Sequence, residues 1–214
     1  MHRYLVTGTD TDVGKTRVTA SLARALKDAG EKTTVVKLVQ TGLDPGVQGD
    51  AALAGSLAGV PHLEFARFRK PADPWSAALA DGMPAVHAED LARVLEQIDG
   101  SIVCEGAGGL AVPLNRIQNF GTLAQLAKLQ IIIAVGLRLG CMNHALLTAA
   151  LCDQMRLKIA GAVLVDRWGR SDDAYIADVR RALQGKLTIL GILPFAVDAS
   201  ASVEAGARLF STLL

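Results

Sequence analysis

The feature that most constrains the fold is the segment GTDTDVGKTR, which occupies residues 8–17. A short apolar run, residues 4–6, precedes it, and apolar residues follow it at helical spacing. This order predicts a strand, a glycine-bearing turn and a helix, which is the setting that a phosphate-binding loop requires. The segment departs from the usual GxxxxGK[ST] pattern, because Thr9 stands where the first glycine is expected and Gly8 lies one residue earlier.

The residue types of this loop suit a nucleoside triphosphate. Gly8 and Gly14 allow backbone N–H groups to approach phosphate oxygens at a helix N-terminus, which carries partial positive charge. Lys15 would reach the β- and γ-phosphates, and the Thr16 hydroxyl would bind Mg²⁺. A structural turn with a surface lysine is the alternative. The predicted nucleotide-binding residues of the loop are Asp12, Val13, Gly14, Lys15, Thr16 and Arg17.

Length and charge narrow the class of protein. A chain of 214 residues is expected to form a single domain over residues 1–214. The formal net charge is +1 and the chain has no basic stripe, so no nucleic-acid partner is expected. The longest apolar runs, such as residues 131–135, are too short to span a membrane, and residues 1–6 do not resemble a signal peptide. We therefore expect a cytoplasmic protein with no membrane partner.

The three cysteines are Cys104, Cys141 and Cys152. Their number is odd and their spacing is not that of metal ligands, so we expect buried, reduced thiols. No chemistry is assigned to them.

Strand-like and helix-like segments alternate along the whole chain. Uninterrupted apolar runs are typical of strands that are buried on both faces of a parallel sheet. The predicted fold is therefore a single doubly wound α/β domain with a mostly parallel sheet, a three-layer Rossmann-like arrangement that carries a P-loop. Beyond the first strand, strands are predicted over residues 33–39, 63–68, 101–104, 131–135, 159–165 and 187–193, and helices over residues 15–29, 50–58, 76–80, 86–98, 121–129, 178–183 and 203–213, with another helix starting near residue 140.

Three charged residues are predicted to lie near the loop, because ligands of an open parallel sheet bind beyond the carboxyl ends of its strands. Lys37 lies near the end of one predicted strand, and Glu105 directly follows another, where P-loop proteins hold an Mg²⁺ carboxylate. Asp50 opens a predicted helix, either as a cap or as a metal ligand. A solvated lysine and an incidental glutamate are the alternatives. The glycine-bearing segment after the glutamate, also expected at the nucleotide, is Gly106, Ala107 and Gly108.

Taken together, the motifs resemble the dethiobiotin synthetase family, the ATP-dependent cyclo-ligases of biotin synthesis. The resemblance implies that 7,8-diaminopelargonic acid (7,8-diaminononanoate), CO₂ and ATP give dethiobiotin, ADP and phosphate. It also implies two intermediates, a carbamate and a carbamic–phosphoric anhydride. The segments that carry it are GTDTDVGKT at Gly8, KLVQTG at Lys37, the acid Asp50, EGAGGLAVPL at Glu105 and LGCMNHALLT at Leu139.

The resemblance also implies roles for individual residues. Lys15 would neutralise charge that develops on the phosphates, and Lys37 would stabilise the carbamate and the transferring phosphoryl group. Thr41 matches the position that contacts the diamine. The implied catalytic residues are Lys37, Lys15 and Thr16, and the implied Mg²⁺ ligands are Thr16, Asp50 and Glu105.

A glycine and polar residues stand at the start of the helix near residue 140, where free N–H groups and the helix dipole can hold an anion. The resemblance implies that this helix start lies at a two-fold dimer interface. There it would bind the carboxylate of a substrate held by the neighbouring subunit, so a homodimer is expected. The residues concerned are Gly140, Cys141, Met142 and Asn143.

Three positions depart from the family pattern. Leu38 replaces a common proline, and Trp75 stands where many members have histidine. Val165 replaces the asparagine that usually reads adenine. Loss of that contact is expected to weaken the preference for ATP over other nucleoside triphosphates by about 1–3 kcal/mol. The second base-contacting stretch matches Pro194, Phe195 and Ala196.

Two other functions are compatible with the loop. A P-loop ATPase switch of the partitioning or metal-insertion type would explain the loop and a dimer, but not Lys37 or the segment LGCMNHALLT. A small-molecule kinase would use the same Mg²⁺ chemistry and would release no free phosphate. Product analysis separates all three.

Overall fold

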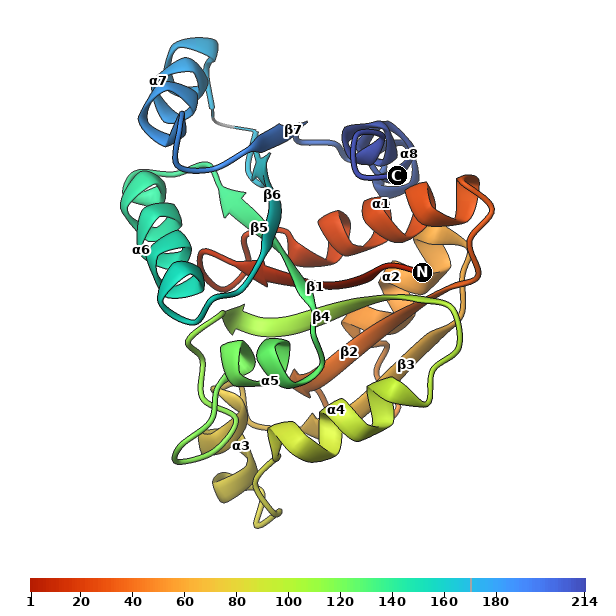
Figure 1. Ribbon diagram of the computed structural model, residues 1–214. Helices are drawn as coiled ribbons and strands as arrows, with labels where there is room; N and C mark the ends of the chain where they lie inside the picture. Colours follow the sequence, from red (N-terminus) through yellow and green to blue (C-terminus); the bar gives the residue numbers. More distant parts are fainter. Residues whose placement is uncertain (170) are drawn as a thin grey trace.

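The computed structural model describes residues 1–169 and 171–214. Its strands join in one sheet with the order β3-β2-β4-β1-β5-β6-β7, and each neighbouring pair is parallel (Figure 1). The loop of residues 9–14 therefore leaves from the middle of the sheet, after β1. The strands are β1 (Arg3–Gly8), β2 (Thr33–Thr41), β3 (His62–Phe68), β4 (Ser101–Gly109), β5 (Gln130–Gly136), β6 (Ile159–Val165) and β7 (Ile189–Leu193).

Helices cover both faces of the sheet and complete a three-layer arrangement (Figure 1). One face packs against α1, α2 and α8, and the other against α3, α4, α5, α6 and α7. The predicted doubly wound α/β fold is confirmed, with a sheet that is parallel throughout the described residues. The helices are α1 (Lys15–Asp28), α2 (Asp50–Ala58), α3 (Pro74–Ala80), α4 (Ala88–Glu96), α5 (Phe120–Leu126), α6 (Cys141–Gln154), α7 (Asp173–Leu183) and α8 (Ala199–Ala207), followed by a 3₁₀ turn over Arg208–Phe210.

Strand β5 shows why the central strands are apolar without interruption. Successive side chains of a strand point to opposite faces of the sheet. Ile131 and Ile133 join the core on the face that α3 to α7 cover, whereas Ile132 and Ala134 join the core on the face that α1, α2 and α8 cover. Because both faces are covered by helices, neither set can be polar.

Several helices begin earlier than the apolar periodicity predicts, because aspartates cap them. Asp172 accepts a hydrogen bond from the Tyr175 N–H, so α7 starts at Asp173 and not near residue 178. Asp198 caps α8 in the same way, and this helix ends at Ala207 and not at residue 213. An aspartate oxygen satisfies N–H groups that the first turn would otherwise leave without a partner.

Strand β4 is longer than predicted. Its pairing with β1 continues to Gly8 and Gly109, so the strand runs on through the glycine-bearing segment. Glu105 therefore lies within a central strand and not directly after one. Its side chain is fixed by the strand register, which pairs it with Lys37 of β2.

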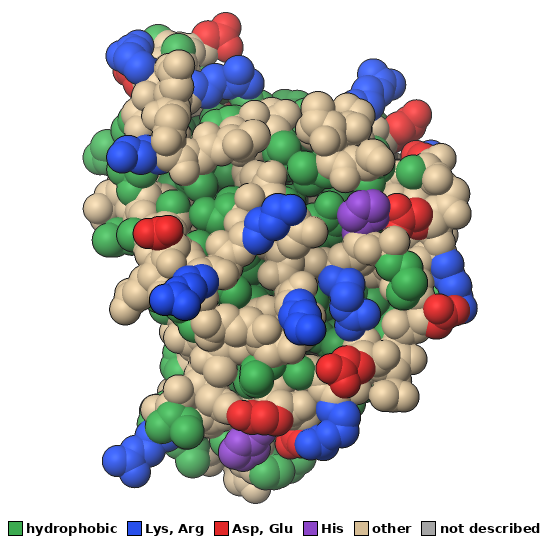
Figure 2. Space-filling model, in the orientation of Figure 1, with side chains coloured by type: hydrophobic (Ala, Val, Ile, Leu, Met, Phe, Trp, Pro, Cys, Tyr) green, Lys and Arg blue, Asp and Glu red, His purple; other side chains and the backbone are tan. Residues whose placement is uncertain are grey.

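The molecular surface carries charges of both signs. On the face drawn in Figure 2, Lys and Arg side chains alternate with Asp and Glu, without a large patch of one sign. Among the described residues, no helix combines the length and the apolar character that crossing a membrane would require.

Candidate active site

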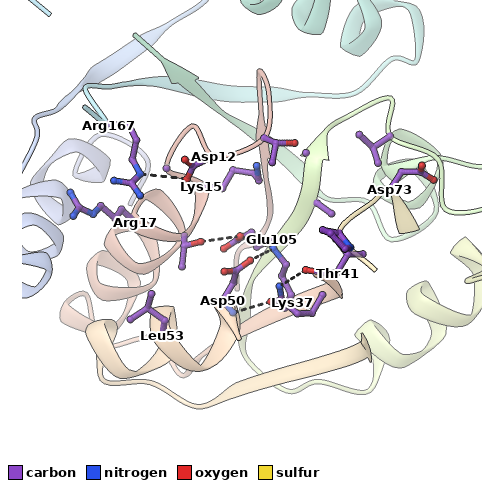
Figure 3. Close-up of a pocket in the computed structure, with 18 of the residues that line it drawn as sticks. Asp12, Lys15, Arg17, Lys37, Thr41, Asp50, Leu53, Asp73, Glu105 and Arg167 are labelled. Carbon is purple, nitrogen blue, oxygen red and sulfur yellow. Dashed lines mark hydrogen bonds and ion pairs between the residues drawn. The ribbon is translucent and has the colours of Figure 1, made fainter. Parts of the chain in front are cut away.

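The carboxyl ends of the central strands border a cavity of about 740 Å³ (Figure 3). The loop between β1 and α1 forms one wall, and the ends of β2 and β4, the start of α2 and the segment before α3 complete it. The structure thus brings together residues from most of the predicted motifs. Of the predicted site residues, those that line the cavity are Asp12, Gly14, Lys15, Thr16, Arg17, Lys37, Thr41, Asp50, Glu105, Ala107 and Gly108.

The loop of residues 9–14 has the backbone geometry that its glycine predicts. Gly14 has φ of 93° and directly precedes α1, and a Cβ atom there would lie 2.8 Å from Cγ1 of Val165. Lys15 folds back over the loop, and its Nζ donates to the Asp10 carbonyl oxygen at 3.1 Å. Burial lowers the pKa of Lys15, which is 7% exposed. An anion in the loop would favour the charged form of this lysine.

Lys37 is enclosed by acceptors at the other side of the cavity. Its Nζ donates to Oδ2 of Asp50 at 2.6 Å, to Oε1 of Glu105 at 2.8 Å and to the Gly106 carbonyl oxygen at 3.3 Å (Figure 3). The side chain of Lys37 is 3% exposed. Burial opposes its charge, but the two carboxylates outweigh that effect and raise the pKa of Lys37. Lys37 is therefore a fixed, buried cation and not a solvated strand-end lysine.

Glu105 joins the lysine to the phosphate loop. Its Oε1 atom also accepts a hydrogen bond from the Thr16 hydroxyl at 3.1 Å. Its Oε2 atom is buried and has no hydrogen-bond partner among the described residues. A buried carboxylate oxygen without a partner is costly, so this atom suits a ligand that is bound in the cavity.

The oxygen atoms of Thr16, Asp50 and Glu105 fit the preference of Mg²⁺ for hard ligands. Within the described chain, no three His, Cys, Asp or Glu side chains form a metal cage. A small set of protein oxygens is what Mg²⁺ uses when phosphates supply other ligands. The donor set therefore suits Mg²⁺ bound together with a nucleotide.

Comparison with known proteins identifies the family of this chain. A family described as an AAA domain matches residues 2–202. An ATP-dependent dethiobiotin synthetase of Rhodococcus jostii is 36% identical, over 97% of this chain and 92% of the relative. Its counterpart in Escherichia coli K12 is 33% identical, over 99% of each chain. The chain belongs to the dethiobiotin synthetase family.

Solved structures place this member of the dethiobiotin synthetase family in a wider fold group. The cell-division ATPase MinD of Pyrococcus furiosus matches with a TM-score of 0.58 at 20% identity, over 99% of this chain and 91% of that one. A ParA family ATPase of Chlorobium tepidum matches with a TM-score of 0.57 at 16% identity, over 99% and 91%. At such identities the likeness shows the fold alone, which is that of P-loop ATPases.

The sequence predicts that Gln40 lies in a loop after the strand, where it could contact a small ligand, whereas the structure places it within β2. Its Oε1 atom accepts a hydrogen bond from the Asp50 N–H at 3.0 Å, and its Nε2 donates to the Thr41 carbonyl oxygen at 3.2 Å. Gln40 is buried and thereby ties the end of β2 to the start of α2. The apolar run ends at residue 39, so no sequence pattern indicated that the strand continues through Gln40.

The predicted base-contacting residues do not line the cavity. Val165 is buried and packs against Gly14. The Ala196 carbonyl oxygen accepts a hydrogen bond from Nη2 of Arg17 at 2.9 Å, so this segment borders the start of α1. Val13 is fully buried. The nucleotide contacts of Val165, Pro194, Phe195 and Ala196 stay predictions.

The predicted carboxylate-binding residues also lie outside the cavity lining. Cys141, at the start of α6, is buried, and its Sγ lies 3.3 Å from the Tyr175 hydroxyl oxygen. That hydroxyl donates to the Arg138 carbonyl oxygen at 2.6 Å, and the Arg138 side chain pairs with Asp10 of the loop. The contacts therefore join the start of α6 to the loop region. Substrate binding by Gly140, Cys141, Met142 and Asn143 stays a prediction.

Proposed function

We propose that this chain catalyses the ATP-dependent carboxylation and ring closure of 7,8-diaminopelargonic acid, with CO₂, to dethiobiotin, ADP and phosphate in biotin synthesis. The observation that carries the proposal is the buried Lys37 ammonium in the same cavity as the phosphate loop. A loop alone would suit an ATPase switch equally well. Membership of the synthetase family supports the ring-closing reaction instead.

The residues suit catalysis by alignment and electrostatics, as is usual for phosphoryl transfer. One amine of the substrate adds to CO₂ and releases a proton to give a carbamate. A carbamate oxygen then attacks the γ-phosphate, and the bond to the β-phosphate oxygen breaks to release ADP and leave the anhydride. Lys37 keeps its proton, because its pKa is raised, and acts as a fixed positive charge beside both anions. Lys15 neutralises charge on the phosphates. The second amine then closes the ring and expels phosphate.

Thr16, Asp50 and Glu105 would hold Mg²⁺, which when bound neutralises charge on the phosphates. The unpartnered Oε2 atom of Glu105 supports this assignment. In Glu105→Gln, the Mg²⁺ concentration for half-maximal binding of ATP should rise about 10-fold or more, because an amide is a much weaker ligand than a carboxylate. Unchanged Mg²⁺ dependence of ATP binding would contradict the assignment.

The deciding experiment is phosphate release by the purified protein with Mg²⁺ and bicarbonate, with and without the diamine, using ATP and CTP in parallel. Phosphate that appears only with the diamine, together with a cyclic urea product, is the expected result. Phosphate release that ignores the diamine would indicate an ATPase switch. A phosphorylated product without free phosphate would indicate a kinase.

The proposal includes a homodimer in the cytoplasm, in which the start of α6 in one subunit binds the carboxylate of the substrate held by the other. Two features support an interface there: Gly140 has φ of 91° immediately before the helix, and Leu139 and Leu147 are exposed. Asn143→Ala should raise the KM for the diamine without changing the KM for ATP. Sedimentation of a fully active monomer would contradict the dimer.

A further inference from the structure

The two ends of the cavity lie on opposite sides of the phosphate loop. Lys37 and Thr41 come from β2, which lies on one side of β1 in the sheet, and Arg167 follows β6, which lies on the other. Figure 3 shows Arg167 and Arg17 at the end away from Lys37. If the proposed function holds, the γ-phosphate faces Lys37, so the nucleoside must extend toward Arg167.

Arg167 is held loosely at this end. Its Nε atom lies 3.6 Å from Oδ1 of Asp12, which is longer than a hydrogen bond, and the two side chains are 37% and 69% exposed. Its Cδ atom lies 3.9 Å from where a Cβ atom of Gly14 would stand, so the side chain crosses the loop. Arg17, by contrast, is anchored to Ala196. The guanidinium of Arg167 can therefore exchange its partner for a bound nucleotide.

Arg167 is the less restrained of the two arginines at this end of the cavity, because Arg17 is already bonded to the Ala196 carbonyl oxygen. Val165 is buried and apolar, so it offers no hydrogen bond. Arg17 and Arg167 both line this end of the cavity, where burial and the charge of Arg167 lower the pKa of Arg17. An arginine has only donors, arranged as a fork that matches two adjacent acceptors. Guanine presents O6 and N7 as such a pair and cytosine presents O2 and N3. Adenine has no two adjacent acceptors, because its amino group lies beside N1 and N7 and its N3 stands alone on the other edge.

We propose that Arg167 contacts the nucleobase and stabilises bases with two adjacent acceptors, guanine and cytosine, so that GTP and CTP bind to the site as well as the ATP of the proposed reaction. Asp12 holds the guanidinium over the loop until a nucleotide binds. The proposal rests on the proposed function for the direction in which the nucleotide lies. It assigns this chain a specificity residue outside the motifs that carry its family resemblance.

The test is equilibrium binding of ATP, GTP and CTP to the full chain with Mg²⁺, by titration calorimetry and without the diamine. In Arg167→Gln, the Kd for GTP and CTP should rise about 10-fold, because a bidentate arginine–base contact is lost, while the Kd for ATP changes less than about 3-fold. Arg167→Lys keeps the charge but not the fork and should lose the same selectivity. The matched control is Arg93→Gln, which breaks an exposed arginine–aspartate pair on α4.

Each other outcome overturns the proposal. Equal weakening for all three nucleotides would place Arg167 at the phosphates or the ribose, and unchanged Kd values would show that it does not contact the nucleotide. Thermal melting of both variants checks that they are folded. Failure of the proposed function would look different from failure of this proposal. No cyclic urea would form in the reaction with the diamine, while nucleotide binding could still be measured.

Discussion

The two ends of the cavity are built in different ways. At one end Lys37 and Glu105 lie opposite each other on neighbouring strands and are almost fully buried. The ion pairs of Lys37 with Asp50 and Glu105 measure 2.6 Å and 2.8 Å. At the other end Arg17 lies in the first turn of α1, Arg167 follows β6, and the ion pair of Arg167 with Asp12 is long and exposed. Strand register holds groups rigidly, whereas loops allow them to adapt. We therefore expect changes at Lys37 to affect the rate and the fold, and changes at the arginines to affect nucleotide affinity.

The largest effect is expected for Lys37→Met, which leaves two carboxylates without their cation. The free energy of unfolding should fall by about 3–5 kcal/mol, since one partner of a buried ion pair is removed. The kcat should fall about 100-fold or more, because a charge aimed at the reacting groups is lost. Urea unfolding and steady-state kinetics measure the two effects.

A second substitution tests the cause of that loss. In Lys37→Met with Glu105→Gln, no buried carboxylate needs a cation, so part of the lost stability should return while activity stays low. If Lys37→Met alone kept the stability and the kcat of the wild type, Lys37 would be shown to contribute neither to the fold nor to the reaction.

A smaller effect is expected for Gln40→Ala. The Asp50 N–H loses its acceptor, which should cost about 1 kcal/mol of stability. Because Gln40 orients the start of α2, kcat should fall about 10-fold while the KM for the nucleotide is unchanged. Gln125→Ala is the matched control, since it removes an exposed glutamine bond to a backbone carbonyl. If Gln40→Ala raised only the KM for the nucleotide, the end of the cavity at Lys37 would also determine nucleotide affinity, which would contradict the distinction between the two ends.

A still smaller effect is expected at the arginine end for Arg17→Ala. This change removes the hydrogen bond to Ala196 and so frees the segment after β7. The KM for the nucleotide should rise about 3-fold, with kcat unchanged, because the contact is partly exposed. Kinetics at saturating diamine measure both constants. A large fall in kcat would contradict the distinction between the two ends.

The smallest effect on activity is expected from the thiols, which serve neither end. Burial raises the pKa of Cys104 to about 12 and that of Cys152 to about 11, above the ordinary value of 9.0. The unfolded chain therefore releases these protons first, so stability is lost as pH rises above 9. At pH 10 the loss is about 1.4 kcal/mol per thiol.

Two measurements check the thiol prediction. A thiol reagent at pH 8 should leave the native protein active, because all three cysteines are buried. Urea unfolding between pH 8 and pH 10 should show a flatter pH dependence in Cys104→Ala with Cys152→Ala than in the wild type. If the stability of the double variant and of the wild type fell equally with pH, the buried thiols would not be the cause of the loss.

Local patterns were sufficient to predict the fold and much of the site. The loop glycines, the helix start at Lys15 and the apolar strands depend on near neighbours in the chain, so they are readable from the sequence. Lys37 and Glu105 were also readable from the sequence. Both lie toward the carboxyl ends of predicted parallel strands, so they were expected to face one cavity. The late starts predicted for α7 and α8 were avoidable, since Asp172 and Asp198 are ordinary helix caps.

Other properties depend on how separate elements pack against one another, whether these elements are near in the chain or far apart. Gln40 meets Asp50 because β2 and α2 pack at a particular register, and Arg167 meets Asp12 because β6 ends beside the loop. A one-residue change in strand register would reverse the facing of each side chain, and no local pattern encodes a partner more than a hundred residues away. The residue pattern thus specifies a phosphate loop in a parallel sheet, whereas packing specifies which side chains surround its ligand.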